Sequence, residues 1–318
     1  MGSARLARVA VRTGQFRQDA RGICPRRRFC CKIDPMRLIT YRQDARSAPA
    51  LLKEDHIFPL SSLGYPDAIS FIAAGPEAWA DAQVQLAETG PMRLAPLSSV
   101  QLDAPVPRPV KMLCIGLNYL DHANETHAEV PSVPTVFPKY PHALIGNGQT
   151  IVLPRASNAP DYEAELALVI GRAGRNIPED EWRDYVFGYT IMNDVSARDV
   201  QKATSQWTLG KNFPTFAPMG PWIVTADEIP DPHNLAIRLS IGGETLQDSN
   251  TRELIFKIPQ LLAYISKMMP LSPGDIISTG TPAGVGMGRT PPRWLKPGDD
   301  VVVEIERIGS LRNPVAAE

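Results

Sequence analysis

The segment DYEAELALVIGR, residues 161–172, constrains the fold more than any other stretch of the chain. Its apolar run from Leu166 to Ile170 is short and rich in β-branched residues, which is typical of a mostly buried strand. Glu163 and Glu165 flank the start of this run, and alternate side chains of a strand point to the same face. Two carboxylates therefore lie in parallel beside a buried sheet, where their repulsion is about 3 kcal/mol at an effective dielectric near 20. Such a strand requires a partner that holds the pair together.

Composition favours a turn-rich β structure. The chain has 31 prolines among 318 residues, about twice the average share, and many of them interrupt short apolar runs. No apolar stretch approaches the roughly 18 residues that a membrane-spanning helix needs, so we expect no membrane association. The four cysteines show neither metal-ligand spacing nor a disulfide framework, which favours a reducing compartment.

Charge is distributed unevenly along the chain. Residues 1–35 contain nine basic and two acidic residues, and the remainder keeps 24 of the 33 basic and 32 of the 34 acidic residues. The acidic body argues against nucleic acid as a partner. We interpret residues 1–35 as a dispensable, largely disordered extension of a cytoplasmic protein. The alternatives are a mitochondrial transit peptide, which would place the protein in the matrix, an expression tag, or sequence upstream of a true start at Met36.

The pattern of strand signals predicts a β-rich α+β protein. Residues 36–104 form a small N-terminal α+β domain with one helix around 76–88, and PVPRP at 105–109 is a stiff boundary before a catalytic domain over 105–318. That domain has strand signals at 111–119, 165–171, 187–194, 220–225, 235–243, 275–280 and 300–306, and helical patterns at 121–130, 195–204 and 254–268. The absence of a βαβαβ alternation favours a mixed sheet rolled towards a barrel.

A third carboxylate also leaves the core at a strand end. GYTIMND, residues 188–194, delivers Asp194 after a run of apolar residues. Three carboxylates at strand ends are what a hard divalent cation needs, with water and substrate oxygens as further ligands. The competing interpretation is an exposed sheet edge with solvated acids. If the site binds metal, loss of Glu163, Glu165 or Asp194 should leave the metal-free fold as stable as before or more so.

Residues 116–126, GLNYLDHANET, supply a candidate general base. His122 and Glu125 are three residues apart, so on a helical turn they face the same way. Glu125 can then fix the tautomer of the imidazole, and His122 can take a proton from water. The competing interpretation is a surface His–Glu pair without a role in catalysis.

Two further segments offer groups for an anionic substrate. Arg198 and Gln201 lie on the predicted helix after Asp194, where Arg198 can reach a carboxylate held near the metal. Lys211, in the Pro-broken segment LGKNFPTF, suits a partly buried ammonium. The ordinary alternatives are a solvated arginine paired with Asp199 or Asp194, and a surface lysine.

The glycine-rich loop STGTPAGVGMG, residues 278–288, lies between prolines and opens no helix, so it is not a dinucleotide-binding fingerprint. Its backbone amides and Thr281 favour an anion. The chain lacks a GxSxG elbow, an HExxH motif and a phosphate-binding loop, which excludes the commonest serine hydrolases, zinc proteases and nucleotidases.

Taken together, GLNYLDHANE, DYEAELALVIG, GYTIMNDVSARD, LGKNFPTFAPMGP and GDIISTGTPAGVG resemble the fumarylacetoacetate hydrolase family in order and spacing. The resemblance covers about residues 108–314 and is greatest to the small domain-containing branch, some members of which are mitochondrial and act on oxaloacetate. It implies a mixed β-roll, a homodimer, and Mg²⁺ or Mn²⁺ bound by Glu163, Glu165 and Asp194. It also implies that His122 and Glu125 lie on a lid, that Lys211 stabilises enolate charge, and that Arg198, Gln201 and Thr281 hold the substrate.

The function we expect is metal-dependent hydrolysis of a C–C bond in small 2,4-dioxo acids such as acylpyruvates. His122 with Glu125 activates water, and the leaving fragment departs as an enolate that the ion and Lys211 stabilise. The alternative is an oxaloacetate keto–enol tautomerase or decarboxylase using the same site. A non-catalytic metabolite-binding protein is a rival of another class, which loss of the carboxylates or of the dyad would favour; neither is lost.

Overall fold

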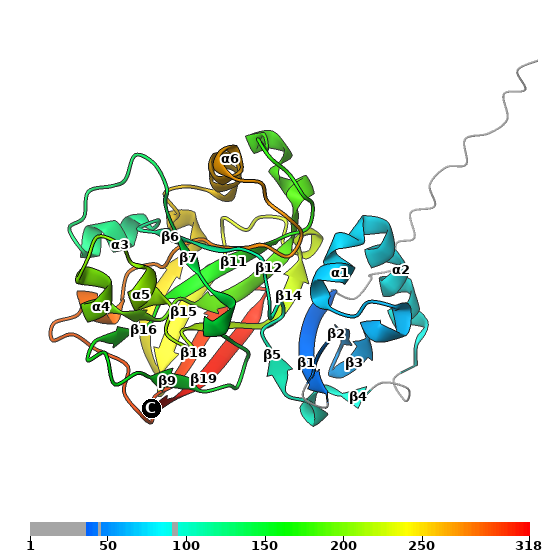
Figure 1. The fold of residues 1–318 in the computed structure, drawn as a ribbon, viewed down its shortest axis with the longest axis horizontal. Helices are drawn as coiled ribbons and strands as arrows, with labels where there is room; N and C mark the ends of the chain where they lie inside the picture. Colours follow the sequence, from blue (N-terminus) through cyan, green and yellow to red (C-terminus); the bar gives the residue numbers. More distant parts are fainter. Residues whose placement is uncertain (1–35, 44–45, 91–94) are drawn as a thin grey trace, which may run out of the picture. The chain divides into compact units, whose positions relative to one another are not determined.

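The computed structural model describes residues 36–43, 46–90 and 95–318 (Figure 1). The predicted disordered extension and the alternative transit peptide both concern residues 1–35, which lie outside the described residues. No helix among the described residues is long and apolar enough to cross a membrane.

A large mixed sheet forms the centre of the molecule. Its strands run in the order β4 (Ala95–Pro96), β3 (His56–Pro59), β2 (Arg46–Lys53), β1 (Arg37–Gln43), β14 (Ala217–Thr225), β12 (Val186–Asn193), β11 (Ala164–Ile170), β17 (Ile276–Ser278), β6 (Met112–Gly116) and β7 (Thr135–Lys139). Neighbours along this path are antiparallel except β17 and β6, which are parallel. The short strands β5 (Leu102–Asp103) and β8 (Leu144–Ile145) pair with β1 and β14.

A second sheet packs against one face of the first. It contains β16 (Glu244–Asn250), β15 (Ala236–Ile241), β18 (Asp300–Ile305), β19 (Gly309–Ala317) and β9 (Ile151–Leu153), in that order. One core cluster joins Leu166 and Leu168 of β11 to Leu239 of β15 and Val303 of β18. The β-rich mixed fold is therefore confirmed, although the sheets of the described residues do not close into a barrel.

Strand β11 is buried on both faces, which explains its unbroken apolar run. The opposite face of the sheet carries Ala167 and Val169 into a second cluster with Phe71 of α1 (Ala68–Ala73) and Leu86 of α2 (Gly75–Glu88). Because every residue of β11 is buried, the acids at its start are carried into the interior rather than to a wet edge. All seven predicted strands of the catalytic domain are present, within a few residues at their ends.

The helices predicted in the catalytic domain are present but shorter, whereas the helix predicted around 76–88 is present at full length as α2. The helix predicted at 121–130 is α3 (Leu120–Glu125), and the one predicted at 195–204 is α4 (Arg198–Lys202). Helix α3 ends early because His127 takes a left-handed φ of 52°, and the Ala128 amide then donates to the Ala123 carbonyl. Residues 196 and 197 form β13 (Ser196–Ala197), which pairs with β10 (Pro160–Asp161) before α4 begins.

Two more helices complete the catalytic region. α5 (Thr208–Lys211) lies next to α4 and β7, and α6 (Ile258–Met268) packs against residues 179–185 (Figure 1). Since β1 pairs with β14, residues 36–104 and the rest of the chain share one sheet. The division into domains at residue 105 stays a prediction.

Candidate functional site

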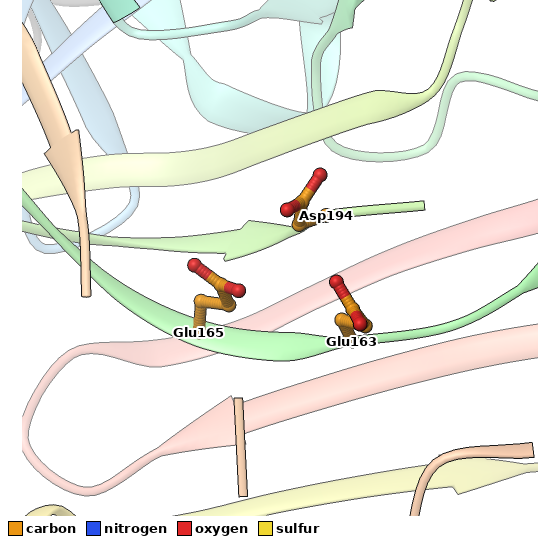
Figure 2. A group of neighbouring side chains, drawn as sticks. All are labelled: Glu163, Glu165 and Asp194. Atoms are coloured by element: carbon orange, nitrogen blue, oxygen red, sulfur yellow. The ribbon is translucent and has the colours of Figure 1, made fainter. Parts of the chain in front are cut away.

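The three predicted metal-binding carboxylates meet in space. Glu163 immediately precedes β11, Glu165 belongs to it, and Asp194 follows β12 directly. Ala164 lies opposite Asn193 in the antiparallel pair of β11 and β12, which brings these two strand ends together. Each carboxylate offers an oxygen within 4.8 Å of the others, and all three residues are buried (Figure 2). The alternative of solvated acids at a sheet edge is wrong.

Buried cations neutralise this cluster. Lys211 Nζ bridges two of the carboxylates, 2.5 Å from Glu163 Oε2 and 2.7 Å from Asp194 Oδ2. Arg198 Nη2 donates to Glu163 Oε1 at 2.5 Å. Lys139 Nζ lies 2.7 Å from Asp194 Oδ1 and donates to the Val195 carbonyl. Lysine and arginine side chains thus supply counterions for Glu163 and Asp194.

Lys139 is a site residue that sequence reasoning missed. It ends β7 and is 2% exposed, as is Lys211. The only signal for it is a lysine at the end of the strand TVFPK, a position that a solvated residue fills equally well.

The two glutamates differ in their electrostatic environments. Burial by itself would raise the pKa of Glu163, but Arg198 and Lys211 hold it well below its usual range. Burial raises the pKa of Glu165 well above its usual range, and the negative charges of Asp194 and Glu163 raise it further. Glu165 accepts hydrogen bonds from Ser278 Oγ and from the amide of Gly280, both on Oε2. These surroundings therefore favour the ionised form of Glu163 and the protonated form of Glu165.

The donor set fits a hard divalent cation. Three carboxylates converge, and Asp194 Oδ1 is buried with the Lys139 ammonium 2.7 Å away as its ionic neighbour. Oxygen donors of this kind suit Mg²⁺ and Mn²⁺ rather than soft metals. Glu163, Glu165 and Asp194 are the residues that would hold such an ion.

The predicted dyad forms on α3. His122 Nδ1 lies 3.2 Å from Glu125 Oε2, and the His122 side chain is nearly buried. Glu125 Oε1 accepts a hydrogen bond of 2.9 Å from the Gly284 amide. With the proton on Nδ1, His122 donates to Glu125, and Nε2 is left as a free base. The dyad is fixed to the glycine-rich loop rather than solvated; whether α3 acts as a lid stays a prediction.

Nearly all of the predicted site residues line one cavity. Its volume is about 220 Å³, and eight of the nine predicted residues line it: His122, Glu163, Glu165, Asp194, Arg198, Gln201, Lys211 and Thr281. Glu125 lies behind His122. Gln201 accepts a hydrogen bond from Arg198 Nη1, and Thr281 Oγ1 accepts one from Gln247, so both are held in place. A larger cavity of about 640 Å³, between β1, β2 and α1, contains none of these residues.

Comparisons with known proteins point to one family. Residues 111–316 match the family model described as Fumarylacetoacetate (FAA) hydrolase C-terminal. The protein named oxaloacetate tautomerase fahd2, mitochondrial, from Xenopus laevis is 49% identical over 220 residues, 69% of this chain and 69% of that protein.

Solved structures agree in fold over most of the chain. Fumarylacetoacetate hydrolase from Exiguobacterium antarcticum has a TM-score of 0.78 at 34% identity, covering 89% of this chain and 100% of that one. Maleylpyruvate hydrolase from Sphingobium sp. SYK-6, in complex with manganese (II) ion and pyruvate, has a TM-score of 0.75 at 30% identity, covering 89% and 99%.

Proposed function

This chain belongs to the fumarylacetoacetate hydrolase family, and we propose that it is a metal-dependent enzyme that interconverts the keto and enol forms of oxaloacetate. The observation that carries the proposal is the 49% identity to a protein named oxaloacetate tautomerase. This was the alternative of the sequence-based prediction, and we now prefer it to C–C hydrolysis.

The charge of the site supports a small dianionic substrate. Among the described residues, this cluster holds four carboxylates (Asp161, Glu163, Glu165 and Asp194) and three cations (Lys139, Arg198 and Lys211), which form ion pairs with every carboxylate except Glu165. A divalent ion, with Glu165 ionised, brings the cluster to a net charge of +1. The cavity of about 220 Å³ is smaller than the roughly 300–1,000 Å³ of sites for drug-sized ligands, which favours a four-carbon acid.

The residues of the cavity have distinct tasks in this reaction. A bound divalent cation supplies Lewis acidity at the 2-oxo group, which acidifies the neighbouring C3–H bonds. Arg198, held by Gln201, binds a substrate carboxylate. His122 removes a proton from C3 through Nε2, and Glu125 keeps the imidazole in the required tautomer and orientation. Lys211 stabilises the negative charge that develops on the carbonyl oxygen, and the imidazolium of His122 returns the proton to that oxygen to give the enol.

C–C hydrolysis of 2,4-dioxo acids remains the second candidate because the same dyad can activate water. A likeness to a maleylpyruvate hydrolase structure supports it. The metal ion also stays a proposal, with Mg²⁺ or Mn²⁺ as the expected species. We further propose a mitochondrial location, since the relative from Xenopus laevis is named mitochondrial, and a homodimer. Size-exclusion chromatography with light scattering tests the dimer, and imaging of full-length protein fused to a fluorescent tag tests the location.

The decisive experiment compares two substrates with the same preparation. With Mg²⁺ present, ultraviolet absorbance follows the decay of enol-oxaloacetate and the cleavage of an acylpyruvate. We expect tautomerisation to be the faster reaction by kcat/KM, to need the metal, and to fall by about 10²–10⁴-fold in His122→Ala. His56→Ala, a histidine of β3 far from the cavity in sequence and absent from its lining, serves as the matched control. Faster cleavage of the acylpyruvate would reject the tautomerase in favour of the hydrolase, and inactivity towards both would reject both.

A further inference from the structure

Asp161 is a fully buried carboxylate to which neither the sequence nor the proposed reaction assigns a task. It lies in β10, two residues before Glu163, and its side chain is 0% exposed. Asp161 does not line the cavity, so it is not placed to contact a substrate bound there. A buried charge is costly unless it is paired and hydrogen-bonded, which raises the question of what Asp161 holds.

Four donors saturate the two oxygens of Asp161. Oδ1 accepts from the amides of Tyr162 (2.8 Å) and Gly286 (2.7 Å). Oδ2 accepts from Arg198 Nε (2.8 Å) and from the amide of Met287 (3.0 Å). One carboxylate thus fixes a substrate-binding arginine from α4 and two consecutive amides of the 3-10 turn η8 (Gly286–Gly288).

Residues 284–288 also contact Glu125 of the His122–Glu125 dyad. The Gly284 amide donates to Glu125 Oε1 at 2.9 Å. A Cβ on Gly288 would lie 2.6 Å from Glu125 Cδ, and a Cβ on Gly286 would lie 2.6 Å from Asp161 Oδ1. Because residues 286 and 288 are glycines, the backbone of residues 284–288 can pack closely against the carboxylates of Asp161 and Glu125.

We propose that Asp161 is a positioning residue that fixes Arg198 and residues 284–288 in one arrangement and, through that loop, sets Glu125 and His122. The carboxylate anchor and the general base, which come from different helices, are then aligned by a single contiguous set of hydrogen bonds. The charge and shape of aspartate are both needed. Asparagine keeps one acceptor oxygen, but its amide hydrogens would face two of the four donors. The proposal rests on the proposed function only for the identity of the substrate.

The test uses full-length Asp161→Asn, with Asp275→Asn as a matched control. Asp275 is equally buried and accepts from two backbone amides and a lysine, but none of its partners lines the cavity. In the substrate-free protein, hydrogen exchange at residues 284–288 and 120–126 should become faster in Asp161→Asn and stay as in the wild type in Asp275→Asn. With oxaloacetate, KM should rise about 10–100-fold in Asp161→Asn, as expected for one lost hydrogen bond to a charged group.

These measurements distinguish a failure of this proposal from a failure of the proposed function. Hydrogen exchange needs no substrate, so it decides the positioning role even if the wild type does not act on oxaloacetate. A purely structural Asp161 would lower the melting temperature while leaving both the exchange pattern and KM of the folded protein unchanged, and that result would overturn the proposal.

If Asp161→Asn fails to fold, Gly288→Ala tests the second half of the connection. The three atoms nearest to the added methyl group, at 2.6–2.9 Å, all belong to the end of the Glu125 side chain. We expect kcat to fall about tenfold or more with KM unchanged, since Glu125 orients the base without touching substrate. Faster exchange at Gly284 should accompany it. Wild-type kcat and wild-type exchange together in this variant would show that the loop does not set Glu125.

Discussion

Glu163 and Glu165 carry the same side chain two residues apart, yet replacing each with glutamine should affect the metal-free protein in opposite ways. Glu163 is a paired anion, with Arg198 and Lys211 both at 2.5 Å. Glu165 has a raised pKa and accepts only neutral donors, Ser278 Oγ and the Gly280 amide. Glutamine imitates a protonated glutamate but not an ionised one. Glu163→Gln should therefore destabilise the fold, and Glu165→Gln should not.

The size of the difference follows from these contacts. A hydrogen bond to a charged group contributes about 1.5–3 kcal/mol, and Glu163 has two of them. Breaking a buried ion pair by neutralising one partner costs about 3–5 kcal/mol, because the remaining charge loses its counterion. We expect Glu163→Gln to lower the free energy of unfolding by about 3–5 kcal/mol. Glu165→Gln should raise it, because glutamine keeps the neutral form's hydrogen bonds without the free energy that keeping Glu165 protonated costs at neutral pH. From the sequence alone we expected that removing either carboxylate would not lower the stability of the metal-free fold. The ion pairs of Glu163 lead us to the opposite expectation for that residue.

Urea unfolding with a chelator present measures the difference, followed by circular dichroism at neutral pH. Calorimetry with Mg²⁺ on the same samples should show that both variants lose affinity, which identifies both residues as ligands. Equal destabilisation of the two variants would refute the assignment of an ionised Glu163 and a protonated Glu165. Unchanged Mg²⁺ affinity in both would reject the metal site.

Three further predictions use simpler measurements. Asp194→Asn should abolish Mg²⁺ binding by calorimetry, and retained affinity would exclude it as a ligand. The pKa of Glu165 is raised in the folded protein, so the stability that Glu165 contributes is present below its ordinary pKa and is lost as the pH rises. With a chelator present, the free energy of unfolding of Glu165→Gln relative to wild type should therefore increase from pH 5 to 8. A difference that stays constant over this range would contradict the raised pKa. Deleting residues 1–35 should leave the melting temperature and turnover unchanged, since all cavity residues lie between 115 and 287; a melting point several degrees lower would show a structural role for the segment.

Features set by local pattern were predictable from the sequence. The seven strands of the catalytic region followed from apolar runs, and the convergence of Glu163, Glu165 and Asp194 followed from acids at strand ends. The His122–Glu125 contact followed from helical spacing alone. Each of these depends on residues near one another in the sequence or on one pair of adjacent strands.

Features set by long-range packing were not predictable. Lys139 reaches Asp194 across 55 positions of the chain, and nothing in TVFPK distinguishes it from a solvated lysine. Asp161 stood in the motif that predicted the metal site, yet its link to Gly286 and Met287 depends on a loop more than a hundred residues away. Helix α3 ended sooner than its pattern indicated, because His127 takes a left-handed φ of 52°.

The bridge that Lys211 forms between Glu163 and Asp194 has a consequence for when the protein takes up its metal ion. An ammonium already occupies the position of a counterion, so the chain can reach its native state before any metal arrives, and a chelator should silence it without unfolding it. Loading then brings a divalent cation next to a tethered ammonium, so that metal binding has to overcome the repulsion between the two positive charges. Activity would follow the free concentration of the cation reversibly, and the protein would behave as a metal-activated enzyme rather than as one that carries its metal permanently.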